Sequence, residues 1–252
     1  MIKNWFSGYR SADLNAMLTE SSHRPWPIPA GKWQYYQEWN NVLFFHWKVP
    51  AELLRPLIPA GLELDLFENE AWISLVPFTM EKISPAGLPP VAFISDFHEI
   101  NLRTYVVTEG KPGVYFLNIE GQKHLSVWIA KLLSGLPYEK ARMQRGKNTY
   151  LSDHAVKGFK LDVEFELKAF ISLKSKLDLW LSERYCLYLN RGQKLYRYEI
   201  HHLEWQIAEM ELKKTKINYA INGLSFTDRT PDLIRYSPGV KVLAWGRQEI
   251  KR

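Results

Sequence analysis

The sequence predicts a mainly β protein whose strands form one antiparallel barrel or sandwich around a single core, with a few short helices. Many segments alternate apolar and polar residues with the period of two that is typical of strands. Turn-forming residues separate these segments at short intervals, whereas helical spacing is rare and brief. With 252 residues, 46% of them hydrophobic, the chain is long enough to bury a sizeable core in one domain.

Residues 1–38 are expected to form an N-terminal arm, and residues 39–252 a single β domain. Ser11 to Leu18 fits a short helix, with Ser11 or Asp13 as its N-cap. Three prolines in residues 24–29 then hold the backbone extended. The arm either packs across the domain through its tryptophans, or it covers a pocket or reaches a second subunit.

Alternation and turn residues locate the strands of the domain. The predicted strands are residues 41–48, 62–67, 71–80, 97–107, 114–119, 158–170, 185–189, 195–202, 205–217 and 232–245. Residues 205–217 fit a helix almost as well, and we interpret them as a strand. Turn residues predict two hairpins, over residues 62–80 and 185–202. The short helices, where apolar residues recur at helical spacing, are expected at residues 49–59, 123–134 and 177–184.

The strand over residues 97–107 carries a row of polar side chains. Glu99, Asn101, Arg103 and Tyr105 alternate along it and therefore share one side, while mostly apolar residues occupy the other. Such a row is either the solvated face of an antiparallel sheet or the lining of a polar pocket. Glu99 and Arg103 could also form an ion pair on that side. In a pocket, a buried glutamate can act as an acid or a base near neutral pH.

Composition and charge argue against several classes of function. The net charge of +6 is spread along the chain and no nucleic-acid-binding module is recognisable, so nucleic acid is not expected as a partner. No apolar run reaches the roughly 18 residues of a membrane helix, and the N-terminus lacks the core of a signal peptide, so we expect a cytoplasmic protein without a membrane partner. The single cysteine, Cys186, is expected to be inert packing. The histidines lack metal-ligand spacing, and neither a metal nor a cofactor is predicted.

Several blocks, in a fixed order, carry a resemblance to a known family. They are residues 43–47, 49–56, 59–65, 71–78, 99–105, 136–138 and 183–185, with a segment that ends at Trp245. Over about residues 39–246, the chain resembles the YqjF-like family, whose function is uncharacterised and whose fold resembles acetoacetate decarboxylase. The resemblance implies an acetoacetate-decarboxylase-like barrel or sandwich that encloses a pocket, often in a homo-oligomer.

The resemblance also implies which residues line that pocket. Acetoacetate decarboxylase forms a Schiff base through a lysine whose pKa is lowered by a second lysine next to it. Tyr138 and Glu139 stand in that place here, and Lys140 follows two positions after the expected nucleophile, on the same face of a strand. Glu99 matches the glutamate of the decarboxylase pocket, and His46 stands where its arginine would be.

Three hypotheses follow for the function. The first is a pocket for a small carbonyl or carboxylate compound, which is bound or undergoes acid/base chemistry without a Schiff base: Arg103 or Arg142 holds the carboxylate, Glu99 moves protons and Tyr138 polarises a carbonyl. The second is a Schiff-base decarboxylase or aldolase-like enzyme that uses Lys140. The third is a structural or oligomeric module without a ligand. The candidate catalytic residues are Glu99 and Lys140, and the candidate ligand-binding residues are His46, Asn101, Arg103, Tyr105, Tyr138 and Arg142.

Overall fold

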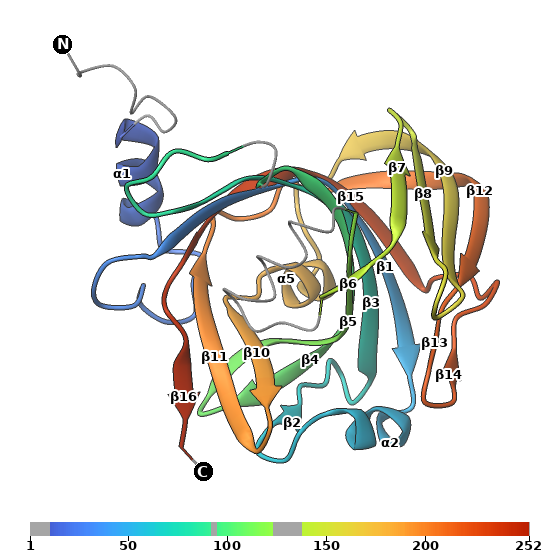
Figure 1. The fold of residues 1–252 in the computed structure, drawn as a ribbon, viewed down its shortest axis with the longest axis horizontal. Coiled ribbons are helices and arrows are strands. Elements are labelled where there is room, and N and C mark those ends of the chain that lie inside the picture. The colour runs from blue at the N-terminus through green and yellow to red at the C-terminus, as the bar shows by residue number, and fades with distance from the viewer. Residues whose placement is uncertain (1–10, 92–94, 123–137, 252) are drawn as a thin grey trace.

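The computed structural model describes residues 11–91, 95–122 and 138–251. These residues form a mainly β structure with a large, strongly curved sheet and short helices, which confirms the predicted fold class (Figure 1). The helices are α1 (Ser11–Thr19), α2 (Ala51–Leu54), the 3-10 turn η1 (Arg55–Leu57) and α5 (Lys176–Ser182). The strands are β1 (Tyr35–Val49), β2 (Glu63–Leu64), β3 (Ala71–Pro85), β4 (Phe97–Thr108), β5 (Lys111–Gly121), β6 (Tyr138–Lys140), β7 (Arg142–Arg145), β8 (Thr149–His154), β9 (Phe159–Phe170), β10 (Cys186–Arg191), β11 (Lys194–His201), β12 (Ala208–Asn218), β13 (Ala220–Ile221), β14 (Leu224–Ser225), β15 (Leu233–Ala244) and β16 (Gln248–Ile250).

The main sheet closes on itself over part of its length. Its strands follow the order β16-β11-β10-β5-β4-β3-β1-β15-β12-β9-β8-β7, mostly with antiparallel neighbours. An additional pairing joins β11 to β15, with Ile200 opposite Ala244 and His201 opposite Leu243. The strands from β11 round to β15 therefore form a ring that surrounds α5, and β12, β9, β8 and β7 continue from it as a curved extension (Figure 1).

The two faces of the sheet support separate hydrophobic cores. Phe44 and Phe45 are neighbours on β1, yet they belong to different cores. On β4, Leu102 and Tyr105, which are three positions apart, also belong to different cores. This division follows from the alternation of side chains along a strand. Both faces of β4 are buried, so its polar row is not a solvated outer face.

The predicted hairpin over residues 62–80 is wrong. β2 pairs with β4, where Glu63 lies opposite Val107 and Leu64 opposite Val106. β3 is already flanked on one side by β1 and on the other by β4, so it offers no free edge to β2. The turn itself forms, but it contributes only an isolated bridge between Phe67 and Glu70.

Most other predicted elements are confirmed. The exceptions are one predicted helix that lies outside the described residues and one hairpin that was not predicted. The hairpin over residues 185–202 is formed by β10 and β11, and residues 205–217 are mainly strand β12. The helix expected at residues 123–134 lies outside the described residues. The hairpin of β7 and β8 was not predicted, because its strands are short and β8 exposes Leu151 while it buries Ser152.

The arm packs against the outside of the ring. β1 begins at Tyr35, a little before the predicted boundary. Met17 of α1 and Trp33 pack with Leu243 and Trp245, at the end of β15. Among the described residues of the predicted arm, Tyr35 and Gln37, which belong to β1, line the cavity described below, whereas residues 13–34 do not.

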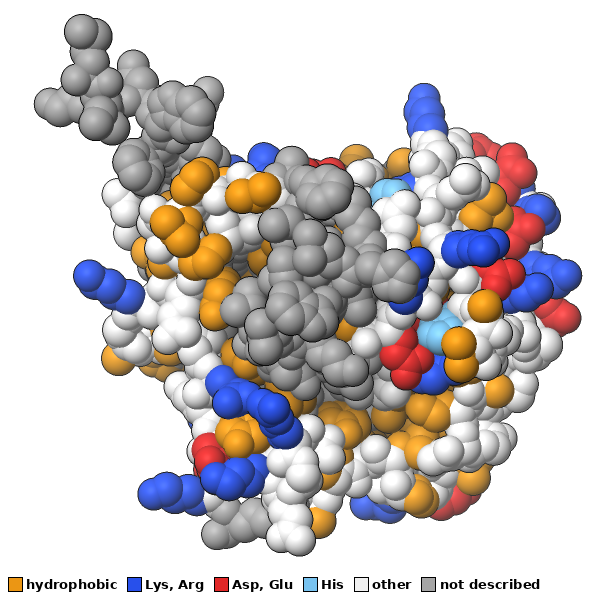
Figure 2. Space-filling model, in the orientation of Figure 1, with side chains coloured by type: hydrophobic (Ala, Val, Ile, Leu, Met, Phe, Trp, Pro, Cys, Tyr) orange, Lys and Arg blue, Asp and Glu red, His pale blue; other side chains and the backbone are white. Residues whose placement is uncertain are grey.

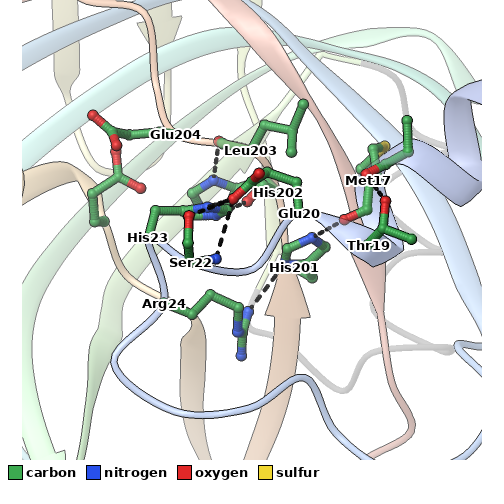
Figure 3. Close-up of polar contacts among 12 residues, drawn as sticks. Met17, Thr19, Glu20, Ser22, His23, Arg24, His201, His202, Leu203 and Glu204 are labelled. Carbon is green, nitrogen blue, oxygen red and sulfur yellow. Dashed lines mark hydrogen bonds and ion pairs between the residues drawn. The ribbon is translucent and has the colours of Figure 1, made fainter.

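A cluster of imidazoles and one arginine joins the arm to the end of β11 (Figure 3). The Nε2 atom of His23 lies 2.8 Å from the carbonyl oxygen of His202, and that of His201 lies 2.7 Å from the carbonyl oxygen of Met17. Arg24 donates to a backbone carbonyl of β11 at 2.6 Å. Burial lowers the pKa of His201 to about 4, and the Arg24 guanidinium adds to this effect. Burial also lowers the pKa of His202. The imidazole of His201 therefore holds the arm in its neutral form. His202 contacts His23 through its backbone carbonyl, and its own Nδ1 atom lies 2.8 Å from the carbonyl oxygen of Leu203.

The exposed face of the extension carries both signs of charge. Lys168 pairs with Glu166 at 2.8 Å, and Lys213 with Glu211 at 2.8 Å. Figure 2 shows basic and acidic side chains intermixed on the side where β8, β9 and β12 lie. The net positive charge of the chain is therefore not gathered on this side. In the described part of the chain, no helix has the length and apolar character needed to cross a membrane.

Candidate functional site

The ring of strands contains a cavity of about 390 Å³. Apolar side chains from β1, β3, β4, β5, β10 and β11 form most of its described lining, together with Trp205 from the segment between β11 and β12. A polar section is formed by Glu99, Asn101 and Arg103 of β4 and by Tyr138 of β6. Alternation along β4 predicted this shared face, and the cavity lies against it.

Glu99 is a buried carboxyl group with few polar neighbours. It is 3% exposed, and burial raises its pKa to about 7, although hydrogen bonds from Tyr138 and Asn101 oppose the rise. The Tyr138 hydroxyl donates to Oε2 at 2.8 Å. A carboxyl group with this pKa is present in both protonation states near neutral pH.

Arg103 is a buried cation without a carboxylate partner. Its side chain is 8% exposed, and its Nε atom has no hydrogen-bond acceptor. Within the described residues, no acidic group forms an ion pair with it. The Oδ1 atom of Asn101 is buried and likewise has no donor. Because buried polar atoms are normally paired, these two residues leave a donor and an acceptor available at the cavity.

The ion pair suggested between Glu99 and Arg103 is not formed. Residues four apart on a strand are separated by roughly 13 Å along its axis. Glu99 is instead bonded to Tyr138, and Arg103 lies over Phe44, with its Cζ atom 5.9 Å from the ring centroid. The two groups therefore act on different parts of the cavity wall.

His46 and Tyr105 lie beside the polar section and are not among the described residues that line the cavity. Ser74 connects them: its Oγ atom is 2.6 Å from His46 Nδ1 and 2.6 Å from the Tyr105 hydroxyl. Burial holds the pKa of His46 well below its usual range, and the charge of Arg103 acts in the same direction. His46 is therefore a neutral hydrogen-bonding group. Ser74 was not identified from the sequence, since only the pairing of β1, β3 and β4 brings the three residues together.

Lys140 and Arg142 are exposed and do not line the cavity. β6 pairs with β5 over three residues only, and Lys140 is its last residue. By alternation, Lys140 shares the face of the inward-pointing Tyr138. Because Lys140 is at the end of the strand, however, its side chain reaches solvent. This differs from the expectation that Lys140 could point into a pocket. The described lining contains no lysine.

Another buried carboxyl group with a raised pKa, which the sequence analysis missed, lies on the opposite face of the sheet. Glu120 of β5 is fully buried, and burial raises its pKa to about 7. Asn118 donates to it at 2.8 Å and Tyr219 at 3.3 Å. Glu120 is paired with Ile100, which faces away from the cavity. The sequence did contain a signal for this group: Asn118 and Glu120 are two positions apart in a mostly apolar stretch, so they share one side of the strand.

The geometry does not favour thiol or metal chemistry in the described part of the chain. Cys186 is buried, and burial raises the pKa of its thiol to about 12. A thiol with such a pKa is a poor nucleophile at neutral pH. No three His, Cys, Asp or Glu side chains among the described residues lie together in a way that could hold a metal ion.

Comparison with known proteins identifies relatives of the chain. Uncharacterized protein YqjF of Bacillus subtilis (strain 168) is 39% identical over 228 residues, which cover 86% of this chain and 93% of YqjF. Among solved structures, the enduracididine biosynthesis enzyme MppR complexed with pyruvate has a TM-score of 0.58 at 9% identity, covering 92% of this chain and 95% of that one. An acetoacetate decarboxylase-like enzyme from Sphingomonas wittichii RW1 has a TM-score of 0.57 at 14% identity, covering 92% of this chain and 98% of that one.

These comparisons confirm the fold and the family that the sequence suggested. At such low identities, the two structural likenesses show the fold alone, which is of the acetoacetate decarboxylase-like type. The DUF2071 family, described as an uncharacterized conserved protein, matches residues 36–241. The chain therefore belongs to the DUF2071 family and is a relative of YqjF.

Proposed function

We propose that the cavity binds a small carboxylic acid that also carries a carbonyl group, and that Glu99 exchanges a proton with this ligand. The observation that carries the proposal is Arg103, a buried guanidinium at the cavity wall without a carboxylate partner among the described residues. A charge in such surroundings is unfavourable unless it is paired. A ligand carboxylate would pair with it, because the fork of a guanidinium matches the two oxygens of a carboxylate.

The charges of the cavity favour an anion. Apart from tyrosines, Arg103 and Glu99 are the only ionisable side chains among the described lining residues. When Glu99 is protonated, the lining carries a net positive charge. Between Glu99 and Arg103, the unpaired Oδ1 atom of Asn101 could accept a hydrogen bond from a hydroxyl group of the ligand.

Glu99 supplies acid/base chemistry in this proposal. Its carboxylate accepts a proton from the carbon next to the ligand carbonyl: the C–H bond breaks, and its electron pair forms the enolate. The carboxyl proton of Glu99 exchanges with solvent, and Glu99 then delivers a solvent-derived proton to the same carbon, so nothing is oxidised or reduced. The positive charge of Arg103 favours the anionic intermediate. Tyr138 donates to Glu99, so we assign it the task of orienting this carboxyl group instead of polarising the ligand carbonyl.

The alternatives have less support. A Schiff base needs an amine in the cavity, whereas the described lining contains no lysine and Lys140 is exposed. A purely structural module would fill its interior with side chains, whereas about 390 Å³ is left open. MppR, which has a similar fold, was solved with pyruvate. Pyruvate is a carboxylic acid with an adjacent carbonyl, and this chemical class suits an arginine beside a protonatable glutamate.

The test measures binding and proton exchange with a panel of 2-oxo and 3-oxo acids. Calorimetry should detect the acids but not their methyl esters, and Arg103→Met should weaken binding at least tenfold. In D₂O, proton NMR should show protein-dependent loss of the signal from the carbon next to the carbonyl. Glu99→Gln should retain binding within about threefold and abolish the exchange.

Arg142→Met is the matched control, because Arg142 is exposed on β7 and does not line the cavity. Its affinity should equal that of the wild type. The proposal is wrong if no acid of the panel binds, or if Arg103→Met binds the acids as well as Arg142→Met does. Borohydride trapping followed by intact-mass measurement should give no adduct; an adduct that Lys140→Ala abolishes would support the Schiff-base alternative instead.

A further inference from the structure

We infer that the ligand carries a large apolar body with an aromatic ring, in addition to the acid group that Arg103 would hold; this inference rests on the function proposed above. The cavity has one polar section, formed by β4 and Tyr138, and the rest of its described lining is predominantly apolar. A ligand that fits both parts must be amphipathic.

Four aromatic side chains form a continuous cage on the apolar side. The ring of Trp39 lies 6.2 Å from that of Trp205, nearly parallel to it, and 6.0 Å from that of Phe78. The ring of Phe44 meets Trp205 edge-on at 5.5 Å. All four residues line the cavity. Aromatic pairs favour offset-stacked and edge-to-face arrangements, and such pairs contribute stabilisation beyond the area that they bury, so this cage suits a ring of the ligand.

A local irregularity of β1 builds this cage. Trp39 and Phe44 are five residues apart, so a regular strand would put them on opposite faces. Asn41, between them, has a φ of 54°, and the register of β1 against β3 shifts between Asn40 and Phe45. The shift changes the phase of alternation, so that Trp39, Val42 and Phe44 all face the cavity.

The acid anchor and the cage adjoin each other. The Cζ atom of Arg103 lies 5.9 Å from the ring centroid of Phe44, which is itself part of the cage. An acid held by Arg103 would therefore place its next groups against Phe44 and Trp205. The polar and apolar parts of one ligand molecule can be bound at the same time.

The size of the cavity also exceeds what a minimal oxo acid needs. The six non-hydrogen atoms of pyruvate occupy at most about 180 Å³, if each takes the roughly 30 Å³ that a water molecule takes in the liquid. This is less than half of the cavity of about 390 Å³. The remaining volume lies among apolar side chains, where an apolar group is favoured over water.

The experiment compares a homologous series of ligands on the wild-type protein. Calorimetry is performed with pyruvate, straight-chain 2-oxo acids of increasing length, phenylpyruvate and 4-phenyl-2-oxobutanoate. Affinity should rise about fourfold for each added methylene group until the cavity is full. The phenyl compounds should bind more tightly than straight chains with the same number of carbons. Trp39→Leu should weaken phenylpyruvate binding about tenfold and change pyruvate binding by less than twofold.

Trp33→Leu is the matched control, since Trp33 is half-buried like Trp39 but packs in the arm, away from the cavity. It should leave all affinities unchanged. Equal affinity for pyruvate and the longer acids would overturn the inference and leave the proposed function standing. Failure of every acid to bind would overturn the proposed function. If phenylpyruvate binds tightly but Trp33→Leu weakens this binding as much as Trp39→Leu does, the assignment of the cage is overturned.

Discussion

At the scale of single residues, the side chains that define the site are those whose burial conflicts with their charge. Glu99 and Arg103 are both buried on one face of β4, yet they are too far apart along the strand to pair with each other. Each is left with a different unmet requirement, a proton for Glu99 and an anion for Arg103. A structural ion pair would have removed both requirements, so this separation is the feature from which a ligand is inferred.

Glu99 makes the stability of the protein depend on pH. Its pKa is about 7 in the folded protein, against an ordinary value of 4.5. Folding therefore favours the protonated form, and this contribution is complete below about pH 4.5 and is lost as the pH rises through 7. Glu99→Gln removes the titration. The unfolding free energy of Glu99→Gln minus that of the wild type should increase by about 3 kcal/mol from pH 4.5 to pH 8, as urea denaturation can measure.

Tyr138→Phe serves as the companion variant. Removing the hydroxyl removes a hydrogen bond that lowers the pKa of Glu99. In Tyr138→Phe, the decrease of the unfolding free energy with rising pH should therefore continue to a higher pH than in the wild type. A difference between Glu99→Gln and the wild type that stays constant from pH 4.5 to pH 8 would mean that Glu99 is ionised throughout, contrary to its burial.

At the scale of secondary structure, the bend in β1 decides which side chains reach the cavity. Gly239 of β15 lies opposite Asn40, next to this bend. Its φ is 134°, and a Cβ atom there would lie 2.3 Å from the carbonyl oxygen of Trp39 and 2.8 Å from the Cα of Asn40. The close approach of the two backbones therefore depends on glycine at this position.

Gly239→Ala should destabilise the protein by more than about 2 kcal/mol, because backbone strain and steric overlap act together. Gly223→Ala is the control: its φ is also positive, at 84°, but nothing lies within 4 Å of the added Cβ. It should cost only about 1 kcal/mol. Thermal and urea unfolding of both variants provide the measurement, and equal losses would show that the contact with β1 is not tight.

At the scale of the whole molecule, the arm is joined to the ring less directly than the extension is. The ring and the extension share one hydrophobic core on the sheet, whereas the arm has a separate, smaller apolar cluster and a group of polar contacts. The arm is joined to the end of β11 by His23, Arg24, His201 and His202 (Figure 3). Because Arg24 and the other imidazoles surround His201, a proton added there meets positive charge instead of an acid partner.

Acid should therefore loosen the arm before it unfolds the ring. The pKa of His201 is about 4 in the folded protein, against an ordinary 6.5. The neutral form is favoured by folding, so this stabilisation is present above about pH 6.5 and is lost as the pH falls towards 4. Hydrogen exchange, corrected for intrinsic rates, should show weaker protection of residues 13–30 at pH 5 than at pH 7. Protection of β3 and β4 should not weaken, because protonation of Glu99 stabilises the ring over the same range.

His201→Gln tests the cause of this change. A glutamine amide can still donate to the carbonyl of Met17 but does not titrate. The variant should therefore lose less arm protection between pH 7 and pH 5 than the wild type does. Equal pH sensitivity in both proteins would assign the effect to another group.

The sequence by itself determined the fold class, most of the strands and the polar face of β4. These features follow from alternation, which is a local property of the chain: it put Glu99, Asn101 and Arg103 on one side before any partner strand was known. The family resemblance also rested on local blocks. The same reasoning failed for Lys140, because spacing does not show where a short strand ends relative to the surface.

Only the tertiary structure decided that this polar face borders a cavity. The pairing of β11 with β15 closes the ring, and β3, enclosed between β1 and β4, leaves β2 to pair elsewhere. The bend at Asn41 turns Trp39 towards Phe44, and Trp205 arrives from a distant segment. All of these depend on contacts between residues far apart in the chain, whose energies a local pattern of side chains does not encode.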